Sequence, residues 1–227
     1  MIYFIHGLNG FAAEWKPFIE YFKKKGYQCN AVELKEGMNL RKTCFQDYVD
    51  KIISMVSKDD ILIGHSMGGL IVQKVMETTK IKAGVCTCPA PPKGIDLRSL
   101  SFLSQIRYMP FIIARIPFLP SFSLAQDRFL NDLSVKEARK RYNLLQKQSA
   151  KVTYEVLKQK VSVDEKKISS PMFFIARQND LMISPSIVKR VAEKYNASMK
   201  TFPGNHNIFL DSESISNEIF KFIKSLS

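Results

Sequence analysis

Short apolar runs alternate along this chain with longer segments whose apolar residues recur at helical spacing. This alternation limits the fold most strongly, because strands separated by helices pair in parallel and become covered on both faces. The pattern predicts an α/β protein with a parallel sheet flanked by helices. Strands are expected at Ile2–Ile5, Tyr27–Leu34, Ile61–Gly64, Ala83–Cys88, Met172–Ala176 and Ser198–Phe202. Helices are expected at Glu14–Lys25, Thr43–Val56, Met67–Thr78, Pro185–Tyr195 and Ser212–Leu226.

The alternation is interrupted once, between the proline-rich turn at Pro89–Pro92 and Ser169. Residues 93–168 show no pattern of a buried strand, and they are predicted to form loops and several helices. A long insertion of this kind is typical of a lid over a functional site. We therefore expect an α/β core made of residues 1–92 and 169–227, with a helical lid at 93–168.

The sequence Gly64-His65-Ser66-Met67-Gly68 follows the third apolar run directly and opens an apolar helical segment. A G-x-S-x-G sequence between a strand and a helix is the pattern of a nucleophile on a strained turn. Glycine two residues before and two residues after Ser66 leaves room for the turn, which lifts the hydroxyl above the sheet. Ser66 is therefore the candidate nucleophile.

A glycine-containing loop, His6-Gly7-Leu8-Asn9-Gly10, follows the first predicted strand. Such a loop can turn backbone N–H groups toward a nucleophile, where they stabilise the oxyanion of a tetrahedral intermediate. We expect the backbone N–H groups of Leu8 and Met67 to form this oxyanion hole.

A serine nucleophile needs a general base, and the chain contains three histidines. His6 belongs to the glycine-containing loop and His65 to the turn, which leaves His206 in the loop after the last predicted strand. That loop lies at the carboxyl edge of the sheet, as Ser66 does. Asp180, just past a buried strand, is a candidate to orient the base, although an aspartate there is also a common turn or helix-cap residue.

Together these segments resemble the α/β-hydrolase superfamily, in its lid-bearing esterase and lipase branch. The similarity covers nearly the whole chain, and the order in which this family places its serine, acid and histidine selects Asp180. The resemblance implies that Ser66 is the nucleophile, that His206 is the general base and then the acid, and that Asp180 orients His206. The family usually has two strands before its histidine–glycine loop, and here that loop follows the first strand. A minimal sheet of about six strands is therefore implied, with Tyr27–Leu34 at an edge.

The predicted lid is both apolar and basic. Its aromatic residues exceed what one helix can hide, so we expect Phe111, Phe118 and Phe122, together with His65, to contact an apolar substrate group. The lid also carries +8 of the chain's net charge of +13. Such a surface suits peripheral contact with an anionic membrane or a phosphate-bearing substrate, while a solvated lysine-rich surface is the simpler explanation. No nucleic-acid-binding motif accompanies the charge, so no nucleic-acid partner is expected.

The four cysteines lack CxxC spacing, so we expect reduced thiols and no metal site. Cys86 and Cys88 are two residues apart in a predicted strand and should share one face. The first residues lack the pattern of a signal peptide, and the longest apolar tract, Tyr108–Pro120, is too short to span a membrane. These features predict a soluble, cytoplasmic protein.

The resulting hypothesis is a serine hydrolase that cleaves a carboxylic ester with a hydrophobic acyl or alkyl part, without a metal or organic cofactor. The substrate would be a small or lipid-like ester. Two alternatives stay open because the same triad and fold serve several reactions. One is a thioesterase or carbon–carbon bond hydrolase, and the other is a hydrolase-fold binding protein with little turnover.

Overall fold

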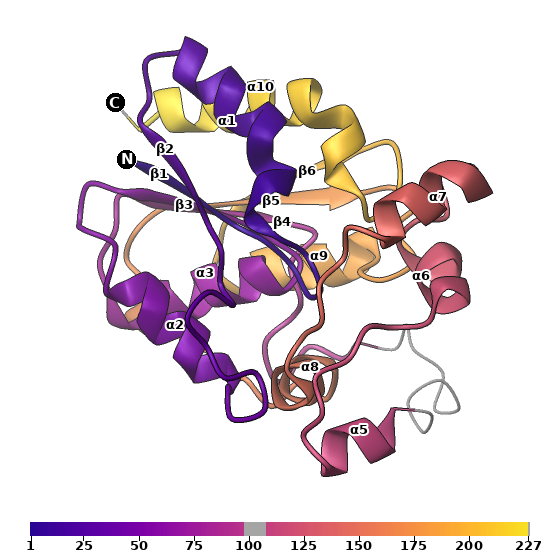
Figure 1. Cartoon of the computed structure of the whole chain (residues 1–227). Helices are drawn as coiled ribbons and strands as arrows, with labels where there is room; N and C mark the ends of the chain where they lie inside the picture. Colours follow the sequence, from indigo (N-terminus) through magenta and orange to yellow (C-terminus); the bar gives the residue numbers. More distant parts are fainter. Residues whose placement is uncertain (98–107, 227) are drawn as a thin grey trace.

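The computed structural model describes residues 1–97 and 108–226, which contain one parallel sheet flanked by helices (Figure 1). Six strands pair in the order β2-β1-β3-β4-β5-β6, and each neighbouring pair is parallel. This arrangement confirms the predicted α/β fold and places β2 at an edge. The strands are β1 (Ile2–Ile5), β2 (Cys29–Val32), β3 (Ile61–His65), β4 (Ala83–Thr87), β5 (Met172–Arg177) and β6 (Ser198–Phe202).

The inner strands β1, β3, β4 and β5 are buried along their whole length, whereas β2 and β6 contain half-buried and exposed residues. Inner strands of a parallel sheet are covered on both faces and therefore appear in the sequence as continuous apolar runs. Edge strands lack this signal. For that reason the limits of β2 were predicted poorly, and the strand covers Cys29–Val32 in place of the expected Tyr27–Leu34.

Helices cover both faces of the sheet (Figure 1). Two helices lie on one face, where Phe18, Phe22 and Ile219 join a buried cluster. Three helices lie on the other face and pack through a second cluster. No helix in the described ranges is long and apolar enough to cross a membrane. The first pair is α1 (Lys16–Lys24) and α10 (Ser212–Lys224), and the second group is α2 (Phe45–Ile53), α3 (Met67–Thr78) and α9 (Pro185–Lys194).

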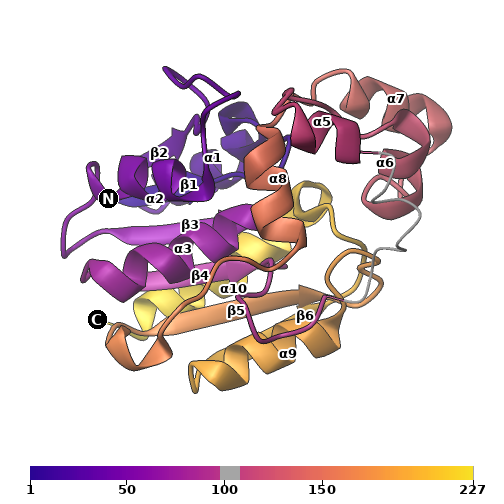
Figure 2. The same cartoon turned by 90° about the horizontal axis from the view of Figure 1, so that it is seen from below.

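Between β4 and β5 the chain forms further helices, which gather beyond the carboxyl ends of the strands (Figure 2). Residues 98–107 of the expected lid lie outside the described residues. Val152 and Val156 join the core cluster under α2 and α3, whereas α6 and α7 pack around a small separate cluster. The segment between β4 and β5 thus packs on the core through α8 and through its two ends, and forms a separate cluster at α6 and α7. Its elements are α5 (Met109–Ile113), α6 (Phe122–Arg128), α7 (Val135–Tyr142), α8 (Ala150–Leu157) and the 3₁₀ helix η2 (Glu165–Lys167).

Cys86 and Cys88 pack in different core clusters, so the expectation that they share a face is wrong. β4 ends at Thr87, and Cys88 adopts a positive φ of 44°. The alternation of a strand does not continue through a residue with that backbone, so a spacing of two no longer determines the face.

Candidate active site

Ser66 lies on a strained turn between β3 and α3, with φ of 54° and ψ of −118°. Its N–H donates to the Thr87 carbonyl at 3.0 Å, and its carbonyl accepts from the Ala90 N–H at 2.9 Å. A Cβ at Gly64 would collide with the backbone of Gly68, and a Cβ at Gly68 would collide with the backbone of β1. The turn therefore requires both glycines of the G-x-S-x-G sequence.

The loop after β1 lies directly beside this turn. A Cβ at Gly7 would approach the Cβ of Ser66 to 3.0 Å. The Leu8 N–H donates to no acceptor in the described part of the chain, and Leu8 lines the same cavity as Ser66. Met67 is the first residue of α3, where N–H groups lack a helical partner. Neither N–H group has a hydrogen-bond acceptor in the described part of the chain; Leu8 lines the cavity, whereas Met67 is fully buried and is not part of its wall.

A half-buried carboxylate, Glu33, contacts the loop after β1. Glu33 Oε1 lies 3.2 Å from His6 Nε2, and Glu33 Oε2 accepts from the Ala12 N–H at 3.1 Å. Burial alone would raise the pKa of Glu33, but the His6 ring, the Ala12 N–H and the charge of Lys35 lower it to about 2. His6 thus holds the loop in place, a role that the sequence did not indicate.

Glu33→Gln should destabilise the fold in a pH-dependent way. The pKa of Glu33 is about 2 in the folded protein, and an unfolded chain gives about 4.3. The carboxylate therefore stabilises the fold above about pH 4.3, and this contribution is lost as the pH falls toward 2. We expect the free energy of unfolding to drop by about 1–3 kcal/mol at neutral pH and by less in acid. Urea unfolding across this range measures the difference, with exposed Glu36→Gln as the control. A destabilisation that does not change with pH would contradict the conclusion that the ionised Glu33 carboxylate stabilises the fold.

The loops after β5 and β6 bring Asp180 and His206 together. His206 Nδ1 lies 2.7 Å from Asp180 Oδ2, and both side chains are buried. Asp180 Oδ1 accepts from the backbone N–H groups of Met182 at 2.7 Å and Ile183 at 2.8 Å. These two bonds fix the orientation of the carboxylate. Because a carboxylate accepts at Nδ1, that nitrogen carries the proton of the neutral ring and Nε2 is left as the base.

Arg177, which the sequence analysis did not identify, holds the loop that carries His206. Its side chain is buried, donates from Nε to the Asn205 carbonyl at 3.1 Å, and pairs with the Asp211 carboxylate. Gly204 has a φ of 102°, and a Cβ there would collide with the guanidinium. The signal available in the sequence was a single positive charge at the end of an otherwise apolar strand.

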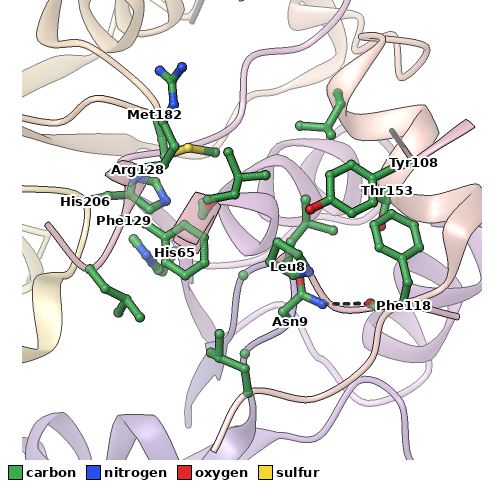
Figure 3. A pocket seen from close by; sticks show the side chains of 18 of the residues that line it. Leu8, Asn9, His65, Tyr108, Phe118, Arg128, Phe129, Thr153, Met182 and His206 are labelled. Atoms are coloured by element: carbon green, nitrogen blue, oxygen red, sulfur yellow. Dashed lines mark hydrogen bonds between the residues drawn. The ribbon is translucent and has the colours of Figure 1, made fainter. Parts of the chain in front are cut away.

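Ser66, His65 and His206 line one cavity of about 170 Å³ (Figure 3). Its wall combines the loops at the carboxyl edge of the sheet with parts of the 93–168 insertion. Most of the wall is apolar, and Phe129 and Met182 contribute to it without having been predicted. Phe129 lies beside Leu130, and Met182 lies between Leu181 and Ile183, so neither was distinguished from its apolar neighbours by the sequence.

Only two of the four residues expected to bind substrate line the cavity. His65 and Phe118 line the cavity, whereas Phe111 and Phe122 are not part of its wall. Phe111 is 39% exposed and packs against Phe118 with ring centroids 5.5 Å apart. Phe122 packs against Tyr142. An apolar run on short helices does not reveal which side chains turn inward.

His65 is packed against His206, with ring centroids 4.7 Å apart. Its Nδ1 lies 3.2 Å from the Thr87 carbonyl. Burial lowers the pKa of His65 well below its usual value, and the charge of His206 lowers it further. His65 thus packs against the His206 ring as a neutral side chain, and its lowered pKa makes it a weak acceptor for a proton carried by His206.

Among the described residues, Cys88, Asp180 and His206 form a group whose metal-ligating atoms lie within 4.8 Å of one another. Burial and the neighbouring Asp180 charge raise the pKa of Cys88 well above its usual value. Metal binding by cysteine requires the thiolate, so this environment opposes it. We assign no metal to this group.

Solved structures of similar fold include several hydrolases. The chain superimposes on an extracellular alpha/beta-hydrolase from a Paenibacillus species with 18% identity, 97% of each chain covered and a TM-score of 0.78. A methylesterase from Arabidopsis gives 13% identity, 98% of each chain and 0.75. A monoacylglycerol lipase from Paleococcus ferrophilus gives 21% identity, 100% of this chain, 94% of that chain and 0.73. At these identities the similarity shows the fold alone.

No curated protein sequence matches the chain significantly. The model of the alpha/beta hydrolase family matches residues 2–215, which is most of the chain. The protein therefore belongs to the alpha/beta hydrolase family.

Proposed function

We propose that this hydrolase cleaves carboxylic esters through a covalent acyl intermediate on Ser66. The observation that carries the proposal is the buried 2.7 Å contact between His206 Nδ1 and Asp180 Oδ2, at a cavity that Ser66 also lines. An imidazole that donates from Nδ1 to a carboxylate has a basic Nε2, which activates a serine hydroxyl. The methylesterase and the lipase among proteins of similar fold favour esters as the substrate class.

In the first step Ser66 Oγ attacks the carbonyl carbon of the ester while His206 Nε2 takes the hydroxyl proton. The backbone N–H groups of Leu8 and Met67 stabilise the oxyanion, and Asp180 stabilises the imidazolium. The bond to the alcohol oxygen then breaks, and His206 returns its proton to that oxygen. Water attacks the acyl-enzyme with the same residues in the same roles, which releases the acid and restores Ser66.

The volume of the cavity indicates how large an apolar substrate group it can enclose. An engineered apolar protein cavity of about 150 Å³ binds benzene. The cavity beside Ser66 is about 170 Å³, so it suits an apolar group of about six carbons. Leu8, Phe118 and Leu145 supply apolar walls for such a group. We therefore propose esters of short aliphatic or aromatic acids as the substrates, in preference to long-chain lipids.

A chain-length series of p-nitrophenyl esters should give the highest kcat/KM at about four to six acyl carbons, because longer chains exceed the cavity. Phe118→Leu removes part of one wall and should lengthen the optimum by about two carbons. Phe122→Leu is the matched control, since Phe122 packs on Tyr142 and does not line the cavity. It should leave the optimum in place. A wild-type optimum at long acyl chains would contradict the proposed size limit.

The two alternative functions are separated by offering other substrates beside the esters. Coenzyme A thioesters and a β-diketone test thioester and carbon–carbon bond hydrolysis under the same conditions. A higher kcat/KM for either would replace the ester assignment. Background turnover with all three classes, together with no labelling by a fluorophosphonate, would identify a binding protein instead.

A further inference from the structure

The 93–168 insertion returns to the active site through two short segments, residues 116–118 and 146–148, which we call the paired stems. Phe118 and Gln148 form an antiparallel bridge, with N–H to carbonyl distances of 3.1 Å and 3.0 Å. The bridge joins parts of the insertion that lie on either side of α6 and α7. The paired stems are thus joined to each other next to the cavity. The loop after β1 and the start of α3 both contact them.

One contact is made by Asn9, the residue after Leu8. Asn9 has a φ of 61° and is buried. Its Nδ2 donates to the carbonyls of Phe118 at 3.2 Å and Gln146 at 3.0 Å, and the first of these bonds is drawn in Figure 3. Its own carbonyl accepts from the Gln146 N–H at 2.9 Å. Three hydrogen bonds therefore tie the backbone beside Leu8 to both stems.

The second contact is made by Gln148, whose side chain is fully buried. Its Nε2 lies 3.7 Å from the sulfur of Met67, and its Oε1 accepts from the Tyr48 hydroxyl at 2.7 Å and from the Ser149 N–H at 3.1 Å. Hydrogen bonds to Oε1 thus fix the carboxamide of Gln148, and its Nε2 contacts the Met67 side chain. The same stems therefore contact Met67 itself and Asn9, the residue that follows Leu8.

We propose that the paired stems position the two backbone donors of the oxyanion hole, through Asn9 beside Leu8 and through Gln148 against Met67. This inference rests on the proposed function, because it assumes that these N–H groups bind an oxyanion. Leu8 and Met67 belong to different elements, the loop after β1 and the start of α3, so their spacing depends on what holds those elements together. Catalytic groups must be held within about 0.5 Å of their working geometry. Asn9 and Gln148 are positioning residues and touch no reacting atom.

Two independent variants test the role of the stems. Asn9→Gly keeps a residue that accepts positive φ and removes the carboxamide. The double variant Tyr48→Phe/Gln148→Met removes both side chains of a buried hydrogen bond, so neither hydroxyl nor carboxamide is left unsatisfied, and only the Ser149 N–H loses an acceptor. Lys147→Ala is the matched control, because Lys147 lies in the same stem with an exposed side chain.

The readouts are kcat and KM for a short p-nitrophenyl ester and the affinity for an alkylboronic acid, which forms a tetrahedral adduct on a serine. A small displacement of catalytic groups costs up to about 100-fold in rate. We expect kcat to fall about 10- to 100-fold in both variants, with boronate affinity weakened by a similar factor. KM should change less than about threefold, because the ground-state ester does not use the oxyanion hole fully. Lys147→Ala should match the wild type.

A higher KM with unchanged kcat and boronate affinity would show that the stems only shape the binding cavity, and it would overturn the proposal. Loss of folding in both variants would assign the contacts to stability and would overturn it as well. The Ser66→Ala variant shows whether a negative result contradicts only the role of the stems or also the proposed function. If Ser66→Ala is inactive and the stem variants keep the wild-type kcat, the positioning role alone is wrong. If Ser66→Ala stays active, the proposed function is wrong.

Discussion

Ser66→Ala should abolish ester hydrolysis and lower kcat by about 10⁶-fold, the order found when a serine protease loses its nucleophile. The Ser66 hydroxyl is the atom that would bond to the acyl group, so a neighbouring group cannot take over its role. The fold should survive, because the hydrogen bonds that hold the turn come from the backbone of Ser66 and are independent of its hydroxyl. Residual activity above the uncatalysed rate would come from the backbone donors and from substrate binding.

The measurement combines kcat for a short p-nitrophenyl ester with covalent labelling by a fluorophosphonate. Labelling of the wild type should add one adduct at Ser66, and the variant should not be labelled. Ser225→Ala, at an exposed position after α10, is the matched serine control. Labelling that persists in Ser66→Ala would contradict the assignment of the nucleophile.

The sheet could be predicted from the sequence because its inner strands are covered on both faces. Such strands are apolar at nearly every position, with polar residues only at their carboxyl ends (His65, Thr87 and Arg177), and each of them appears as a short continuous run. The edge strand β2 has half-buried and exposed positions, so its limits were less clear. The positive φ of Cys88 left no signal in the sequence, and the face of that residue was predicted wrongly.

The proposed catalytic residues were also accessible from the sequence, because Ser66, Asp180 and His206 each follow a strand closely. Parallel strands bring all such positions to one edge, and the structure places Asp180 and His206 in direct contact there. The choice of Asp180 still depended on the family's chain order, since a loop aspartate has several ordinary roles. The roles of Ser66 and His206 were thus predicted from the motif, the choice among three histidines and the topology, and the role of Asp180 from resemblance.

The supporting residues could not be predicted, because their partners lie far away in the sequence. Asn9 donates to a carbonyl 109 positions away and to another 137 positions away. Tyr48 donates to Gln148 across 100 positions. These contacts depend on how the insertion folds back over the core, and no local pattern of side chains encodes that path. For the same reason, the sequence did not show which side chains of α5 and α6 line the cavity.

His206→Ala should lower kcat as severely as Ser66→Ala, again by about 10⁶-fold, because a serine hydroxyl without its base is a poor nucleophile. The double variant Ser66→Ala/His206→Ala should be no less active than either single variant, since the two residues act as a unit. His65→Phe keeps a ring against His206 and should cost much less. Rates for all four proteins are compared with the same ester. Severe loss in His65→Phe with activity retained in His206→Ala would reverse the roles of the two histidines.

Asp180→Asn should lower kcat by about 10⁴-fold, less than loss of the histidine. The Met182 and Ile183 N–H groups bind Asp180 Oδ1 at 2.7 Å and 2.8 Å, so an amide there must keep its oxygen toward them. Its NH₂ group then faces His206 Nδ1 and donates to it, which moves the ring proton to Nε2 and removes the base. Steady-state kinetics measures the loss, and thermal unfolding confirms that the variant is folded. Wild-type activity in Asp180→Asn would mean that another group orients His206.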